Sequence, residues 1–288
     1  MRRAALGVLI GLAAQTPPAP ARPPILGIAH VRVQTSDLAK ARVFYGRLLG
    51  LSELRVDMPA GVAVFNVNSR QRIIVRGGLP ADRDDRLMDL AFEADSLARM
   101  REWLTARGVA APAPAADVDA AAHALSLADP DGHTILLVQP DAPSAAPASS
   151  GGDNALSKRI LHAGLTVKDA AAADRFYKDV LGFSEIWRGG RTDGVTSWIN
   201  MRVPEGTDYL EYMLQTAPAN RRQLGVDHHI ALLVNDIQAA LERVRSRTGA
   251  DDPNHRASPQ IGRNNRWQLN LYDPDGTRIE LMEPWTVR

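Results

Sequence analysis

Two near-identical segments of the chain differ in whether they carry a carboxylate. Residues 129–140 read DPDGHTILLVQP, and residues 273–284 read DPDGTRIELMEP. Glu280 in the second segment corresponds to Leu136 in the first. A carboxylate is costly to bury in an apolar strand unless it has a partner. Glu280 is therefore the first residue whose type suggests chemistry rather than packing.

Histidine recurs at a fixed distance in a second pair of segments. One segment begins at His30 and reads HVRVQTSDLAKARVFYGRLLGL, and the other begins at His162 and reads HAGLTVKDAAAADRFYKDVLGF. Six identities lie 132 positions apart: His30, Asp37, Phe44, Tyr45, Leu49 and Gly50 match His162, Asp169, Phe176, Tyr177, Leu181 and Gly182. Identities held in register at one period indicate an internal repeat.

Each copy of this repeat predicts a strand followed by a helix. The aspartates at 37 and 169 follow an alternating strand and suit helix N-caps. Apolar residues at 38, 41, 45 and 48 form a helical stripe. Gly50 and Gly182 then lie where a left-handed C-cap is expected.

Two further segments follow the same plan. MDLAFEADSLARMREWLTARG begins at Met88 and HIALLVNDIQAALERVRSRTG begins at His229, each seven residues before an aspartate, Asp95 or Asp236. Each leads into a DPDG turn and a final strand, since Pro and Gly there favour a reversal. The sequence thus predicts an α+β fold of four βαβββ modules, at about 25–78, 86–140, 158–216 and 225–284.

The modules pair into two domains, because a single module leaves one sheet face exposed. We assign 25–140 and 158–288 to these domains, joined by a Pro/Ala/Ser/Gly-rich linker at 141–157. Residues 1–24 are expected to be an export signal with a Pro-rich spacer. Two arginines precede an apolar run of eleven residues, which is too short to span a membrane.

Composition limits the classes of function. A formal net charge of +1 with scattered basic residues gives no sign of nucleic-acid binding. The absence of cysteine excludes disulfides and a thiol nucleophile. We therefore expect a soluble protein, periplasmic or secreted, without a membrane span, that is a monomer or a homodimer.

At this point the chain resembles the vicinal oxygen chelate superfamily, which includes glyoxalase I, methylmalonyl-CoA epimerase, bleomycin-resistance proteins and extradiol dioxygenases. The resemblance rests on H-x6-D-x7-FY-x4-LG, present twice, and on the terminal DPDGxxIELxEP. It extends from residue 25 to residue 284. It implies paired βαβββ modules whose sheets curl around a metal, with ligands from the first and last strands of each module.

In the C-terminal pair, the positions that the resemblance points to hold His162, Glu211, His229 and Glu280. Two imidazoles and two carboxylates suit one divalent ion such as Zn, Ni, Fe(II), Co or Mn. His228 has the wrong interval to Asp236, so we assign His229 to the site and His228 to the surface or a pocket wall.

The N-terminal pair is expected to bind no metal. His30 remains, but its counterpart partners are Met88, a residue of QRIIVRGG and Leu136, none of which supplies a carboxylate or an imidazole. We therefore interpret this domain as structural.

Three kinds of function are compatible with this ligand set. The preferred one is a lyase or isomerase in which the metal chelates adjacent substrate oxygens and stabilises an enediolate, with Glu211 or Glu280 as the catalytic base. The second is an extradiol dioxygenase, favoured by the four-module chain but lacking the family's acid–base His and Tyr. The third is a non-catalytic metal-containing binding or resistance protein.

The substrate is expected to be a small, oxygen-rich molecule. Candidate contacts in the metal-bearing pair are Trp198, Asn200, Arg263, Arg266 and Asn270. The arginines could pair with a substrate carboxylate.

Overall fold

The computed structural model describes residues 20–54, 60–109, 113–114, 124–139 and 152–287. Residues 1–19 of the expected export signal and spacer at 1–24, and residues 141–151 of the expected linker at 141–157, lie outside these residues, so both remain predictions. Within the described part of the chain, no helix has the length and apolarity needed to cross a membrane.

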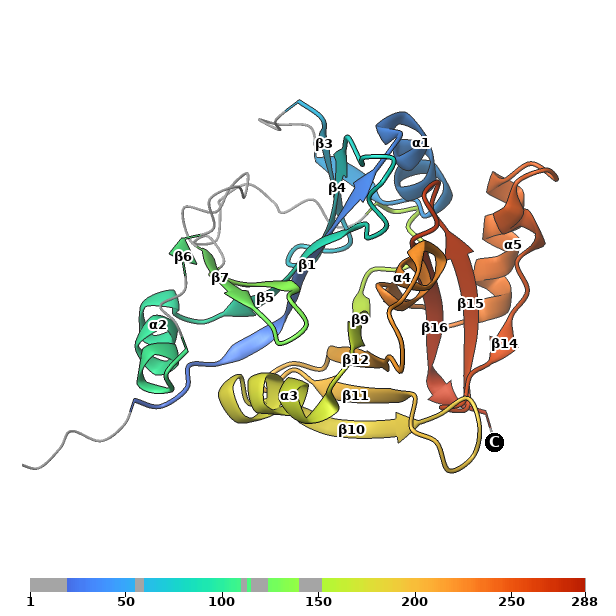
Figure 1. Ribbon diagram of the computed structural model, residues 1–288. Coiled ribbons are helices and arrows are strands. Elements are labelled where there is room, and N and C mark those ends of the chain that lie inside the picture. Colours follow the sequence, from blue (N-terminus) through green and yellow to red (C-terminus); the bar gives the residue numbers. More distant parts are fainter. Residues whose placement is uncertain (1–19, 55–59, 110–112, 115–123, 140–151, 288) are drawn as a thin grey trace, which may run out of the picture.

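Residues 25–138 build the first sheet from two βαβββ modules (Figure 1). The first module contains β1 (Ile25–Thr35), α1 (Leu38–Arg42), the π-helical turn η1 (Val43–Leu48), β2 (Ser52–Leu54), β3 (Val62–Asn66) and β4 (Arg72–Gly77). The second contains β5 (Leu87–Ala94), α2 (Leu97–Ala106), β6 (Ala113–Pro114), β7 (Ala124–Ala128) and β8 (Thr134–Val138). The strand order is β2-β3-β4-β1-β5-β8-β7-β6, so the first strands of the two modules meet at the centre.

The second sheet repeats this arrangement. Its third module contains β9 (Ile160–Val167), α3 (Ala170–Asp174), η2 (Arg175–Val180), β10 (Ser184–Gly189), β11 (Trp198–Arg202) and β12 (Tyr209–Leu214). A connecting helix α4 (Arg221–Asp227) leads to β13 (Ile230–Leu233), α5 (Ile237–Arg247), η3 (Pro253–Arg256), β14 (Gln260–Ile261), β15 (Arg266–Tyr272) and β16 (Arg278–Thr286). The order β10-β11-β12-β9-β13-β16-β15-β14 confirms the predicted α+β fold of four modules.

The local signals predicted from the repeat are largely confirmed. Asp37 caps α1 by accepting from the amide of Lys40, and Asp169 caps α3 in the same way. Gly50 and Gly182 end the helical segments with φ of 74° and 82°, a conformation that disfavours a side chain. One signal was wrong: Ser96, not Asp95, caps α2. Aspartate and serine both suit an N-cap, so the sequence could not show which of the two adjacent residues caps the helix.

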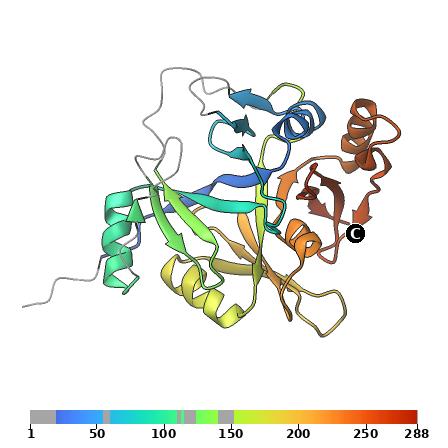
Figure 2. The ribbon, with the colours of Figure 1, turned by 45° about the horizontal axis from the view of Figure 1, so that its top comes forward.

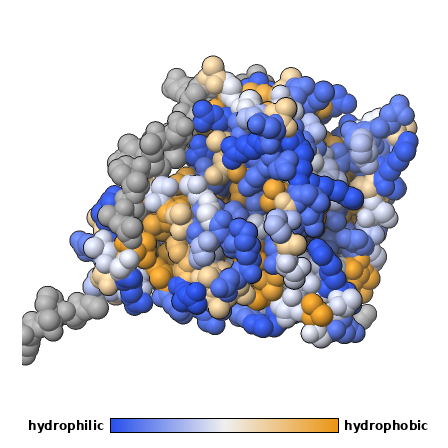
Figure 3. Space-filling view, in the orientation of Figure 1, coloured by the Kyte–Doolittle hydropathy of each residue, from blue (hydrophilic) through white to orange (hydrophobic). Residues whose placement is uncertain are grey.

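Helix α2 lies at one side of the molecule and α5 at the other, whereas α4 lies near the middle beside β9 and β16 (Figures 1 and 2), where β1 and β9 also run. Buried side chains of both sheets join in one apolar core. The face seen in Figure 3 is mainly hydrophilic, with apolar residues exposed in smaller patches.

Two reciprocal hydrogen bonds hold the sheets together. Tyr177 of η2 donates to Asp129 at 2.8 Å, and Tyr45 of η1 donates to Asp273 at 3.0 Å. Each tyrosine thus reaches the DPDG turn of the other domain. The sequence explains the repeated FY pair and the repeated turn only as helix and turn signals, but together they form part of the domain contact.

Candidate metal centre

The four side chains expected to bind a metal converge on the second sheet. The Nε2 atoms of His162 and His229 lie 2.9 Å apart. The Oε2 of Glu211 is 3.3 Å from the Nε2 of His229 and 3.8 Å from that of His162. The Oε2 of Glu280 lies 3.7 Å from the Nε2 of His229.

Strand register accounts for this convergence. His162 on β9 is level with Ala231 on β13, which in turn is level with Glu280 on β16. Glu211 on β12 is level with Gly164, two residues after His162. Residues paired across neighbouring strands share a face, as do residues two apart on one strand. All four side chains therefore project from one face of the sheet.

Gly164 makes room for one of the imidazoles. A Cβ at this position would lie 2.2 Å from Nδ1 of His229 and 2.5 Å from the backbone oxygen of Asp227. The imidazole therefore packs directly on the backbone of β9, a position that only glycine permits. The corresponding residue of the first repeat is Arg32.

Burial controls the charge of these groups. Loss of hydration holds the pKa of both His162 and His229 well below the usual range, although Glu211 opposes the effect at His162. Burial also raises the pKa of Glu280 to about 7, which the neighbouring charge of Glu211 reinforces and Arg278 opposes. Near neutral pH the two imidazoles are consequently neutral, with lone pairs available for a metal.

Several buried atoms here have no hydrogen-bond partner among the described residues. They are Nδ1 of His162, Oε1 of Glu280 and the side-chain oxygens of Asn200 and Asn270. Atoms of His162, His229 and Glu280 that could ligate an ion all lie within 4.8 Å of one another. A divalent cation would compensate the buried carboxylate, and two imidazoles with a carboxylate suit such an ion. The residues therefore fit a metal.

The orientation of His229 depends on two neighbours. Its Nδ1 lies 3.0 Å from the carbonyl oxygen of Asp227 and 2.8 Å from the guanidinium of Arg278. Donation to the carbonyl leaves Nε2 unprotonated, whereas acceptance from Arg278 places the hydrogen on Nε2. A metal at Nε2 would select the first tautomer, which is the usual arrangement for metal-binding histidines.

The predicted substrate contacts divide into two groups. Asn200 is level with Glu211 and Asn270 is level with Glu280, so both amides flank the carboxylates on the same face. Trp198 shares the face of Asn200, and the charge of Arg266 reaches His162. Arg263 instead pairs with the fully exposed Asp193 at the rim.

His228 lies apart from His229, on a pocket wall. It is buried and bonds to Thr166 and Asp85 rather than to the candidate metal ligands. Of the two predicted locations for His228, the surface or a pocket wall, the structure shows the pocket wall.

Comparison with known proteins identifies the family. The model of the Glyoxalase/Bleomycin resistance protein/Dioxygenase superfamily matches residues 27–137 and 159–281. The chain belongs to this superfamily. The vicinal oxygen chelate resemblance expected from the sequence is thereby confirmed. An uncharacterized protein, YwbC of Bacillus subtilis (strain 168), is 34% identical over 84 residues, covering 29% of this chain and 67% of that protein.

Solved structures with this superfamily fold include ring-cleaving dioxygenases. Homoprotocatechuate 2,3-dioxygenase from Brevibacterium fuscum, in complex with 3,4-dihydroxyphenylacetate, matches with a TM-score of 0.67 and 18% identity. The match covers 94% of this chain and 83% of that chain. The 2,3-dioxygenase LapB from Pseudomonas sp. KL28 gives 0.66 and 18%, covering 91% and 93%. At these identities the likeness concerns the fold.

The superfamily's metal position in the first sheet contains an internal ion pair. The register of His30 with Ala91 makes Asp89, not Met88, the counterpart of His229. The expectation that this domain supplies no further carboxylate was therefore wrong. Asp89 lies 3.0 Å from Nε2 of His30 and 2.7 Å from Nε of Arg32. The guanidinium already compensates the carboxylate, and the metal-free state of this domain stays a prediction.

Sequence reasoning missed Gly164, Asp227 and Arg278. Gly164 could have been found by comparing HAGL at 162–165 with HVRV at 30–33, because glycine stands there in place of Arg32 near the repeated histidine. Arg278 occupies the position that Thr134 has in the first DPDG segment. Asp227 acts through its backbone carbonyl, for which a side-chain pattern carries no signal.

We predict that Gly164→Ala displaces the imidazole of His229 and weakens metal binding at least tenfold. The added methyl group meets both the ring and a backbone oxygen, so side-chain adjustment alone cannot relieve the overlap. Metal content after dialysis against a weak chelator measures the effect. Gly249→Ala is the matched control, because a Cβ there meets nothing within 4 Å. Equal metal retention by both variants would contradict the proposed seat of His229.

We also predict that metal uptake depends on pH through Glu280. Below its pKa of about 7 this carboxyl is protonated and must release its proton to bind the metal, whereas the histidines are already neutral. Uptake should release about one proton per ion near pH 6 and almost none above pH 8, with affinity falling roughly tenfold per pH unit on the acid side. Calorimetry in buffers of different ionisation enthalpy measures the protons. A release independent of pH would refute this assignment.

Proposed function

We propose that the protein is a divalent-metal-dependent dioxygenase that cleaves the ring of a small substrate with two adjacent hydroxyl groups. The observation that carries the proposal is the buried His162–His229–Glu280 cluster. Two histidines and one carboxylate are the ligand set of non-haem Fe(II) oxygenases. The metal would supply the Lewis acidity and the electron transfer that ring cleavage by dioxygen requires.

The architecture of the whole chain supports this proposal over the lyase or isomerase favoured from sequence. Two domains of this chain match ring-cleaving dioxygenases over 91–94% of its length. No finding specifically favours lyase or isomerase chemistry, so the preference expected from sequence is reversed. The resemblance in fold alone does not assign a substrate, and the ligand set of the site is therefore the primary argument.

Glu211 would provide the acid–base chemistry in this proposal. Its side chain is 13% exposed and faces both imidazoles, so it borders the cluster while keeping access to solvent. A carboxylate in this position can accept the proton of a substrate hydroxyl as the substrate binds. It would thus take the part of the acid–base histidine that the sequence lacks. The amide groups of Asn200 and Asn270 can orient the substrate oxygens by hydrogen bonding.

The lyase or isomerase remains the second candidate because Glu211 could instead be a metal ligand. The Oε2 of Glu211 lies 3.3 Å from the Nε2 of His229. Small side-chain adjustments would let it serve as the fourth ligand of a single ion. Four protein ligands would leave two positions for adjacent substrate oxygens, and polarisation of an oxyanion would then be the metal's task. The two candidates therefore differ in the role of one residue.

Replacing Glu211 separates the two functions. If the protein is a ring-cleaving dioxygenase, Glu211→Gln should retain about one metal per chain and lose activity by roughly 10²–10⁴-fold, because only proton transfer is removed. If Glu211 is a fourth ligand, the same variant should lose metal. The measurements are elemental analysis of protein purified without oxygen, and oxygen uptake with a panel of catechols.

Glu280→Gln serves as the control, since it should lose metal under either reading. Iron with catechol-dependent oxygen uptake would support the dioxygenase. Zinc, nickel or cobalt in the wild-type protein, with no oxygen uptake from any catechol even after loading with Fe(II), would overturn it.

A further inference from the structure

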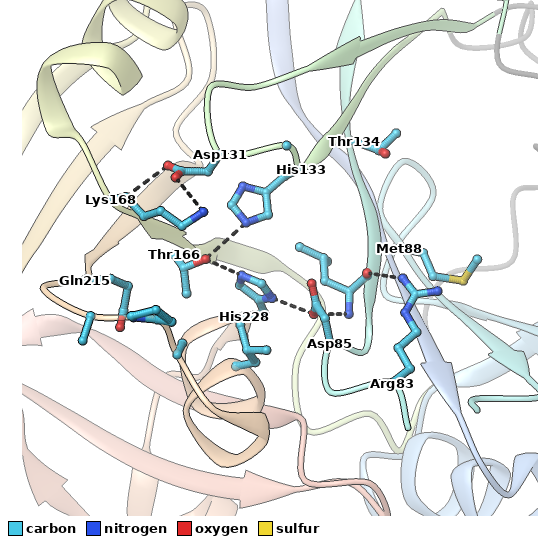
Figure 4. Close-up of a pocket in the computed structure, with 16 residues that line it drawn as sticks. Arg83, Asp85, Met88, Asp131, His133, Thr134, Thr166, Lys168, Gln215 and His228 are labelled. Atoms are coloured by element: carbon cyan, nitrogen blue, oxygen red, sulfur yellow. Dashed lines mark hydrogen bonds and ion pairs between the residues drawn. The ribbon is translucent and has the colours of Figure 1, made fainter. Parts of the chain in front are cut away.

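A continuous chain of hydrogen bonds crosses between the two domains beside the metal centre (Figure 4). Asp129 lies 2.8 Å from Nδ1 of His133, whose Nε2 lies 3.2 Å from the hydroxyl of Thr166. The same hydroxyl lies 2.9 Å from Nε2 of His228, whose Nδ1 lies 2.8 Å from Asp85. These five residues are called the interdomain chain below.

The middle of the interdomain chain belongs to the two polypeptide segments that carry the histidine ligands. Thr166 lies on β9 four residues after His162, and His228 immediately precedes His229. The bond between Thr166 and His228 therefore ties one ligand segment to the other. Asp85, His133 and Asp129, at the two ends, all come from the N-terminal domain, so this domain supports both segments from outside.

The interdomain chain is not a consequence of the duplicated fold. The repeat places Gln34, Met88 and Thr277 at the positions of Thr166, His228 and His133. Gln34 bonds instead to the carbonyl of Gly78 and to Arg83, and the hydroxyl of Thr277 is buried without a partner among the described residues. A device needed only to join the domains would be expected on both sides. It occurs only beside the candidate ligands.

The surroundings show how the interdomain chain can act. It borders a pocket of about 400 Å³ between the domains, which Arg83, Lys168 and Gln215 also line. Within the interdomain chain, both nitrogens of each imidazole lie within hydrogen-bond distance of a partner, and the single hydroxyl proton of Thr166 can be donated to one of the two Nε2 atoms. Thr166 and His228 are buried. Buried polar groups that face one another suit a support better than a ligand site.

We propose that Asp85, His133 and Thr166 are positioning residues through which the N-terminal domain fixes the distance and orientation of His162 and His229. This inference rests on the proposed metal site. It adds that the N-terminal domain helps to hold the ligands of that site. Groups that orient metal ligands affect affinity nearly as strongly as weak ligands do. Loss of the central hydroxyl should therefore weaken metal binding without removing a ligand.

Cobalt(II) is a suitable probe, because its affinity and its visible absorption both report ligand geometry. Thr166→Val, which keeps the shape and removes the hydroxyl, should weaken Co(II) binding roughly 10–100-fold and alter the visible spectrum. Thr166→Ser restores the hydroxyl and should restore both. Asp85→Ala, at a more exposed end of the interdomain chain, should act in the same direction and provides a second test if Thr166→Val folds poorly.

Tyr45→Phe is the matched control. It removes the hydrogen bond to Asp273, which joins the domains on the other side, without touching the interdomain chain. It should lower stability but leave Co(II) affinity and spectrum unchanged. Wild-type affinity in both Thr166→Val and Asp85→Ala, or equal weakening in Thr166→Ser and Thr166→Val, would overturn the inference alone. A wild-type protein that takes up no Co(II) would overturn the metal site and this inference together.

Discussion

The burial of charge at the middle of each curved sheet is the constraint on which the rest of the structure depends. A carboxylate removed from water needs a cation nearby or must take up a proton. In the first sheet, Arg32 provides the cation for Asp89 at 2.7 Å. In the second sheet the corresponding position is Gly164, and burial raises the pKa of Glu280 to about 7 even though the guanidinium of Arg278 lies 3.6 Å from its carboxylate. The same repeat position thus carries a cation in the first sheet and none in the second.

The difference between Arg32 and Gly164 also determines how much space is left beside the strand. Arg32 extends from β1 toward the carboxylate, whereas Gly164 leaves its volume to the imidazole of His229. A metal ligand and an internal cation cannot both occupy that volume. The difference between Arg32 in the first repeat and Gly164 in the second therefore changes both the charge and the space at this position. The same backbone with the same repeated histidine can accommodate a filled ion pair in one domain and a candidate metal centre in the other.

The sequence predicted the fold because the modules repeat, and it predicted the four converging side chains because the resemblance to the superfamily implies ligands on the first and last strands of each module. A fixed offset of 132 carries the strand, cap, helix and C-cap from one copy to the next without knowledge of the fold. It failed where structure depends on register. Counting from Asp95 instead of Ser96 moved the expected partner of His30 by one residue, from Asp89 to Met88, and a shift of one reverses the face of a strand. Strand β5 also has irregular pairing with β1, which composition does not reveal.

The contact between the domains gives the N-terminal domain a physical role. Tyr45 and Tyr177 form equivalent bonds to the two DPDG turns, but the turns differ in their next polar neighbour. Burial alone would raise the pKa of Asp129, yet the hydrogen bond and charge of His133 lower it below its usual range. Asp273 lacks a histidine partner among the described residues, and burial raises its pKa. The polar partners of this contact thus differ between its two sides: His133 reaches Thr166 on the strand of His162 on one side, and Thr35 and Ser36 donate to Asp275 on the other. The N-terminal domain, whose corresponding position holds the Asp89–Arg32 ion pair, therefore contacts the strand that carries a candidate ligand of the other domain.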